Sequence, residues 1–116
     1  VLEYLYPKYT LHIITNGFEE VQNQKIKNSG LEKYFKTITN SEKSGAKKPN
    51  PIIFNHAIEQ ANASKANAIM IGDCIDADVI GALDFGMSAI YFNEHFKKVP
   101  ANIVQINHLI ELKKYL

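Results

Sequence analysis

Short apolar runs alternate with amphipathic stretches along this 116-residue chain. The runs that predict strands are residues 11–15, 34–39, 68–71, 87–92 and 103–106. The stretches with helical periodicity or helix-end signals are residues 19–29, 52–61, 76–85 and 107–115. Residues 40–51 combine Ser, Gly, Lys and two prolines, which predicts a loop.

The alternation of strand and helix predicts an α/β fold. Residues 52–61 place Ile53, Phe54, Ala57 and neighbouring apolar side chains on one helix face. The uninterrupted apolar run 68–71 suits a parallel strand that is covered on both faces. We therefore expect a Rossmann-like three-layer sandwich, with a parallel sheet between helices. Ligands of such sheets bind at the carboxyl ends of the strands.

Composition narrows the class of protein. A chain of 116 residues is expected to form one domain, residues 1–116. A net charge of +1 gives no reason to expect a nucleic acid polymer or a membrane surface as partner. The only cysteine, Cys74, excludes an internal disulfide, and no signal peptide is recognisable. We expect a cytoplasmic protein.

Thr15-Asn16-Gly17 follows the first predicted strand and precedes a predicted helix. Backbone N–H groups at such a position, with the Thr15 hydroxyl, suit a phosphate group. Gly17 would let the backbone approach the ligand closely. Taken alone, these residues are better explained by the alternative, an ordinary strand-to-helix turn with Asn and Gly as turn formers.

Lys48 precedes Pro49 in the predicted loop. Its ammonium group suits a phosphoryl oxygen or an acyl-phosphate carboxylate. Pro49 favours Lys48 over its neighbour Lys47 for this role, because proline holds the preceding residue extended. A solvated surface lysine is the alternative interpretation.

Asp73 comes directly after the apolar run 68–71, and Asp78 follows five residues later. We expect Asp73 near a buried edge of the sheet, where an unpaired charge is costly. Two carboxylates at a strand end suit Mg²⁺, which usually takes one or two carboxylates plus water and substrate phosphate. The alternatives are a helix N-cap for Asp73 and a first-turn helix acid for Asp78.

Other reactive side chains are interpreted as structural. Asp76-Ala77-Asp78 begins three residues beyond the strand, inside a predicted helix, so it is rejected as a nucleophile site. Cys74 is expected to pack as a small side chain. No metal-ligand spacing links the histidines, which are His12, His56, His95 and His108.

Taken in order, Thr15-Asn16-Gly17, Lys48-Pro49 and Gly72-Asp73 with Asp78 resemble the second, third and fourth motifs of the haloacid dehalogenase-like hydrolase superfamily. The resemblance extends from about Tyr9 to Asn93. Within the superfamily the sequence is similar to pyrimidine 5′-nucleotidases that carry a helical cap.

The resemblance implies a Mg²⁺-dependent phosphomonoesterase that acts through an aspartyl-phosphate on a small phosphorylated metabolite, with nucleoside monophosphates as one class. It gives Thr15 a hydrogen bond to the transferring phosphoryl group. Asn16 and Gly17 would supply nearby backbone contacts. Lys48 would stabilise charge on the phosphate and on the nucleophile.

The resemblance also implies the metal ligands. Asp73 would bind Mg²⁺ directly. Asp78 would either support the metal through water or orient the lysine.

One departure from the family is serious. The first motif, an Asp-x-Asp at the end of the central strand, and the cap that usually sets substrate choice are both absent from this sequence. We expect this chain alone to be inactive, and we expect further sequence upstream, because Val1 begins within a helical stretch. A missing central strand should separate the Thr15 and Asp73 strands, and their exposed edges favour self-association.

Two other hypotheses remain. One is a non-catalytic α/β domain that binds phosphate or metal, or that takes part in assembly. The other is a metal-independent dehalogenase, against which the Asp73 and Asp78 pair argues.

Overall fold

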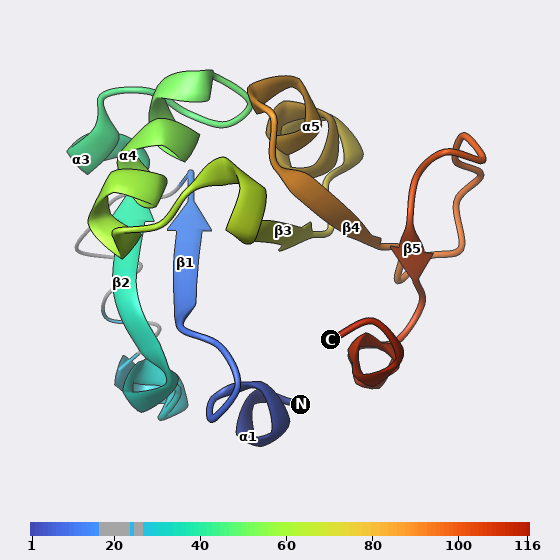
Figure 1. Cartoon of the computed structure of the whole chain (residues 1–116), viewed down its shortest axis with the longest axis horizontal. Coiled ribbons are helices and arrows are strands. Elements are labelled where there is room, and N and C mark those ends of the chain that lie inside the picture. The colour runs from blue at the N-terminus through green and yellow to red at the C-terminus, as the bar shows by residue number, and fades with distance from the viewer. Residues whose placement is uncertain (17–23, 25–26) are drawn as a thin grey trace.

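The computed structural model describes residues 1–16, 24 and 27–116 (Figure 1). The strands are β1 (Leu11–Thr15), β2 (Phe35–Asn40), β3 (Ile69–Gly72), β4 (Ser88–Phe92) and β5 (Gln105–Ile106). The α-helices are α1 (Leu2–Leu5), α3 (Ser41–Ser44), α4 (Pro51–Ala61) and α5 (Gly81–Phe85). The 3₁₀ helices are η1 (Glu32–Tyr34), η2 (Lys65–Asn67) and η4 (Leu109–Lys114), and η3 (Ile75–Ile80) is a π-helix.

The described strands form two parallel sheets rather than one. β1 pairs with β2, and β3, β4 and β5 form a second sheet in that order. β1 and β3 are not hydrogen-bonded to each other, so the separation expected from the sequence is present in the described part of the chain. The register aligns Thr15 with Asn40 and Gly72 with Tyr91.

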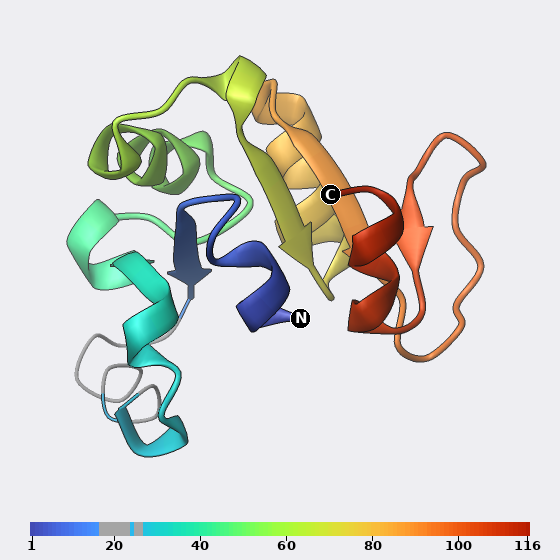
Figure 2. The same cartoon turned by 60° about the horizontal axis from the view of Figure 1, so that its bottom comes forward.

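Helices cover both faces of the larger sheet (Figure 2). The alternation along β4 sends Ala89 and Tyr91 into the core cluster formed with α4, η3 and α5. Ile90 points to the opposite face, where it packs with α1 and η4 through Leu5 and Leu112. Two-residue periodicity along a strand accounts for this division. The predicted three-layer α/β arrangement is confirmed.

Helix α4 connects the two sheets. Asn50 caps it by accepting a hydrogen bond from the Ile52 N–H at 3.0 Å, and Pro51 occupies its first turn. Phe54 is fully buried, and its ring stacks on Phe85 of α5 with centroids 5.9 Å apart. Ile14 of β1 packs against the same core cluster, so α4 ties the smaller sheet to the larger one.

Several predicted elements differ from the structure. The predicted loop 40–51 contains α3, because the Asn40 side chain caps the Lys43 N–H at 2.9 Å. The predicted closing helix, residues 107–115, is the shorter 3₁₀ helix η4. Most of the predicted helix 19–29 lies outside the described residues. Among the helices described here, none combines the length and apolar character that crossing a membrane requires.

Phe54→Ala is expected to lower the free energy of unfolding by about 3–5 kcal/mol, because it leaves a cavity in the shared core. The control is Ile52→Ala on the same helix, whose side chain is 53% exposed and should cost no more than about 0.5 kcal/mol. Urea denaturation measures both. Equal losses in the two variants would contradict this placement of the core.

Candidate active site

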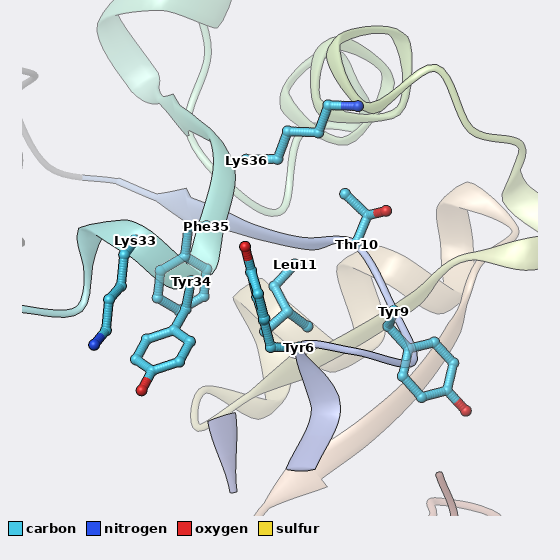
Figure 3. A pocket seen from close by; sticks show the side chains of 8 residues that line it. All are labelled: Tyr6, Tyr9, Thr10, Leu11, Lys33, Tyr34, Phe35 and Lys36. Atoms are coloured by element: carbon cyan, nitrogen blue, oxygen red, sulfur yellow. The ribbon is translucent and has the colours of Figure 1, made fainter. Parts of the chain in front are cut away.

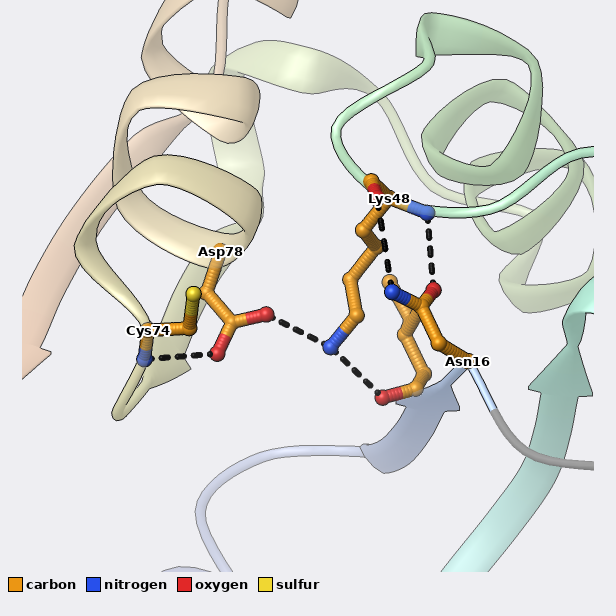
Figure 4. Close-up of polar contacts among 5 residues, drawn as sticks. Asn16, Lys48, Cys74 and Asp78 are labelled. Carbon is orange, nitrogen blue, oxygen red and sulfur yellow. Dashed lines mark hydrogen bonds and ion pairs between the residues drawn. The ribbon is translucent and has the colours of Figure 1, made fainter.

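Lys48 and Asp78 form the centre of the candidate site (Figure 4). The Lys48 ammonium group lies 2.5 Å from Oδ1 of Asp78, and the two side chains are 10% and 5% exposed. The same ammonium group donates to the backbone carbonyl of Ile14 at 3.3 Å. Lys48 therefore bridges from β1 of the smaller sheet to the helix that follows β3 of the larger one.

The turn after β3 fixes Asp78. In the π-helix η3, the carbonyl of Cys74 accepts hydrogen bonds from both Asp78 and Val79, at 2.9 and 3.4 Å. The Cys74 N–H in turn donates to Oδ2 of Asp78 at 3.2 Å. A Cβ at Gly72 would overlap the Asp78 carboxyl group, so only glycine fits at this position. Such π-turns are frequent at functional sites.

The backbone of Lys48 is clamped by Asn16. Oδ1 of Asn16 accepts from the Lys48 N–H at 2.7 Å, and Nδ2 donates to the Lys48 carbonyl at 3.3 Å. Lys47 is exposed, whereas the side chain of Lys48 reaches Asp78. A Cβ at Gly81 would lie 2.8 Å from Cβ of Pro49, so glycine lets the Lys48 loop pack closely on α5.

Asp73 differs from the sequence-based expectation. We expected it near a buried edge, but it is exposed, because it follows the end of β3 where the chain turns toward η3. Among the described residues, none pairs with its carboxylate. The two oxygens of Asp78, in contrast, are engaged by Lys48 and by the Cys74 N–H. Asp78 thus orients the lysine, one of the two roles left open by the sequence.

The carboxylates near the end of β3 are the oxygen donors available to Mg²⁺ in the described residues. No group of three His, Cys, Asp or Glu side chains suited to a metal occurs in the part of the chain that is described. A solvent-facing carboxylate such as Asp73 still fits Mg²⁺, which keeps several waters and needs only one or two carboxylates. The described residues therefore suit a metal ion whose remaining coordination positions are filled by water and by other groups.

The structure describes two of the three residues of the predicted phosphate-binding segment. Thr15 ends β1, and Asn16 follows it and holds Lys48. Gly17 lies outside the described residues. Sequence reasoning missed the hydrogen bonds by which Asn16 holds the backbone of Lys48. It also missed Asn40, which is fully buried and aligned with Thr15. Nδ2 of Asn40 has no hydrogen-bond partner among the described residues. Asn40 directly before the Ser41 helix start was the available signal.

The remaining reactive side chains stay outside this centre. Cys74 is exposed rather than packed as expected, and it serves the site through its backbone N–H and carbonyl groups. Burial, and then the charge of Lys36, lower the pKa of His12, whose Nδ1 lies 2.6 Å from Oγ1 of Thr37. A neutral His12 held within the smaller sheet agrees with its structural interpretation.

A pocket of about 450 Å³ lies at the opposite ends of the strands (Figure 3). Its lining comes from the N-terminal ends of β1 and β2 and the segments before them, and it includes Tyr6, Leu11 and Tyr34. Tyr6 and Tyr34 meet edge to face there, with ring centroids 5.7 Å apart. None of the sequence-predicted site residues lines this pocket, so its size does not make it the candidate active site.

Lys48→Met is expected to destabilise the protein by about 3–5 kcal/mol, because it leaves the Asp78 charge buried without a partner. Asp78→Asn removes that charge and keeps an acceptor for the Cys74 N–H. The double variant should therefore lose less unfolding free energy than the two single variants lose together, by at least about 1 kcal/mol. Urea denaturation measures this coupling, with Lys47→Met as the neutral control. Strictly additive effects would show that the ion pair does not bridge the sheets.

Comparisons with known proteins identify the family of this chain. The profile of the haloacid dehalogenase-like hydrolase family matches residues 1–92. Pyrimidine 5′-nucleotidase YjjG of Escherichia coli is 35% identical over 108 residues, which are 90% of this chain and 48% of that protein.

Solved structures of two relatives share the fold. A HAD phosphatase from Thermococcus onnurineus is 35% identical with a TM-score of 0.91, and the match covers 98% of this chain and 54% of that one. YfnB of Bacillus subtilis, described as a HAD-hydrolase and solved bound to magnesium, is 31% identical with a TM-score of 0.89, covering 98% and 51%. The chain spans about half the length of these relatives. Because the family profile covers most of the sequence, this chain belongs to the haloacid dehalogenase-like hydrolase family.

Proposed function

We propose that this chain carries the phosphate- and metal-binding part of a Mg²⁺-dependent phosphomonoester hydrolase. The observation that carries the proposal is the Lys48–Asp78 pair, held beside the carboxyl ends of β1 and β3. The names of two similar proteins, a pyrimidine 5′-nucleotidase and a HAD phosphatase, support phosphate ester hydrolysis. A small phosphorylated metabolite is the proposed substrate, and the nucleotidase relative favours nucleoside monophosphates.

Lys48 acts by charge in this proposal. Phosphoryl transfer depends mainly on positioning and on stabilising the charge of the phosphoryl oxygens. Asp78 and Asn16 hold the side chain and the backbone of Lys48, so its ammonium group needs little rearrangement when a phosphate binds. Thr15, at the end of β1, would donate its hydroxyl hydrogen to a phosphoryl oxygen. Backbone contacts from Asn16 and Gly17 would complete the phosphate site.

Asp73 would hold Mg²⁺ through its exposed carboxylate, and Asp78 would orient Lys48 and support the metal through water. Bound Mg²⁺ would neutralise charge on the phosphoryl oxygens. The solved structure of YfnB bound to magnesium supports Mg²⁺ as the ion.

The covalent step needs a nucleophile that this chain does not supply. A carboxylate oxygen attacks phosphorus, the alcohol leaves with a proton, and water then hydrolyses the acyl phosphate. The aspartates of the chain all lie in or after the β3–η3 turn, and they are Asp73, Asp76, Asp78 and Asp84. None follows β1, and Asp78 is already paired with Lys48. We infer that the chain alone does not turn over phosphate esters.

In the protein encoded by the complete reading frame, Lys48→Ala is expected to lower kcat for a phosphomonoester by about 10²–10³-fold, the usual loss for a charge-stabilising group. Lys47→Ala is the matched control and should stay within twofold. Release of inorganic phosphate from p-nitrophenyl phosphate, with and without Mg²⁺, measures the activity.

Full activity of Lys48→Ala would exclude the assigned role of the lysine. Halide release from a 2-haloacid, with no phosphate release from any ester, would instead identify a dehalogenase. Neither activity in the complete protein would favour a non-catalytic binding domain.

A further inference from the structure

A pocket of about 180 Å³ opens beside Asp73 at the carboxyl ends of β3 and β4. The parallel register explains the position, because Gly72 pairs with Tyr91 and the next residues, Asp73 and Phe92, therefore become neighbours. The residues that line the pocket are Asp73, Tyr91, Phe92, Glu94, His95 and Lys97. A ligand bound at Asp73 would therefore lie next to this pocket.

Buried Asn93 shapes the turn of residues 94–97 that forms one wall of the pocket. Asn93 is 2% exposed, its Oδ1 accepts from the Lys97 N–H at 2.8 Å, and its Nδ2 donates to the Lys97 carbonyl at 2.7 Å. Nδ2 also donates to Oε1 of Gln105 at 2.8 Å, and Asn107 donates to the Asn93 carbonyl at 2.9 Å. These bonds anchor the turn to β5 and to the segment that follows it.

The same turn contains a backbone conformation that bulky residues rarely adopt. Phe96 has φ +53° and is 68% exposed. The hydrogen bonds of Asn93 on both sides of Lys97 hold this strained turn in place. Phe96 does not line the pocket, whereas its neighbours Glu94, His95 and Lys97 do.

The size and the polar groups of the pocket restrict its ligand. Pockets for drug-sized molecules usually measure about 300–1,000 Å³, so about 180 Å³ suits one small chemical group. Glu94 accepts hydrogen bonds, Lys97 donates them, and His95 does both. Hydroxyl groups both donate and accept, so they match this mixture. A second phosphate would meet the negative charges of Asp73 and Glu94.

We propose that the turn of residues 94–97 is a specificity element of the hydrolase, in which Glu94 and His95 bind hydroxyl groups on the alcohol part of the substrate. The preferred substrate is then a hydroxylated phosphomonoester, such as a glycerol phosphate or a sugar phosphate. This inference rests on the proposed function, because it treats Asp73 as the edge of the reaction site.

The test uses two esters that differ only in hydroxyl groups, glycerol 1-phosphate and propyl phosphate. In the complete protein, kcat/KM should be at least about tenfold higher for glycerol 1-phosphate, since a site built to bind a hydroxyl group rejects the analogue without it. Glu94→Ala should remove this preference through a higher KM for glycerol 1-phosphate, with kcat unchanged, and should leave propyl phosphate within twofold. Lys98→Ala, in the neighbouring position outside the pocket, is the control.

Equal kcat/KM for the two esters in the unaltered protein would overturn the inference, and so would an equal effect of Glu94→Ala on both. Binding of each ester, followed by NMR, separates this inference from the proposed function. If neither ester is hydrolysed but glycerol 1-phosphate alone binds, and Glu94→Ala abolishes that binding, the hydroxyl site stands and the hydrolase proposal falls. Absence of binding by both esters would overturn the hydroxyl site as well.

Discussion

The buried charge of Lys48 is the constraint on which this structure depends. An ammonium group that is largely removed from water needs partners. The Ile14 carbonyl of β1 and the carboxylate of Asp78, in the helix that follows β3, provide them. The pair therefore has a structural consequence as well as a chemical one. It holds the carboxyl ends of β1 and β3 in a fixed relation, although no hydrogen bonds join these two strands.

Two asparagines fix the backbone of loops that follow strands. Asn16 binds both backbone polar groups of Lys48, and Asn93 binds both backbone polar groups of Lys97. Each asparagine follows a strand directly, after β1 and after β4. The same pair of side-chain to backbone hydrogen bonds thus orders the two loops that follow β1 and β4. Because Gly72 has no side chain, the carboxylate of Asp78 in η3 can lie against the end of β3.

Periodicity and motif order were sufficient to predict much of this arrangement. The strand at residues 11–15 and the buried face of α4 depend on local apolar patterns, and both are confirmed. The exposure of Asp73 was not predictable, because it depends on where the chain turns after β3. The clamp of Asn16 on Lys48 joins residues 32 positions apart, and no sequence spacing encodes such a contact. Helix α3 was missed because its cap, Asn40, lies inside a run of turn-forming residues.

The central claim is that Asn16, Lys48 and Asp73 serve one phosphate- and metal-binding site. Titration of the protein with inorganic phosphate, with and without Mg²⁺, tests it most directly when the backbone amide signals are followed by NMR. We expect phosphate to shift the amide signals of Asn16 and Lys48, and Mg²⁺ to add a shift at Asp73. Lys48→Met should remove the phosphate response. Phosphate shifts that survive Lys48→Met, or shifts confined to residues far from β1 and β3, would contradict it.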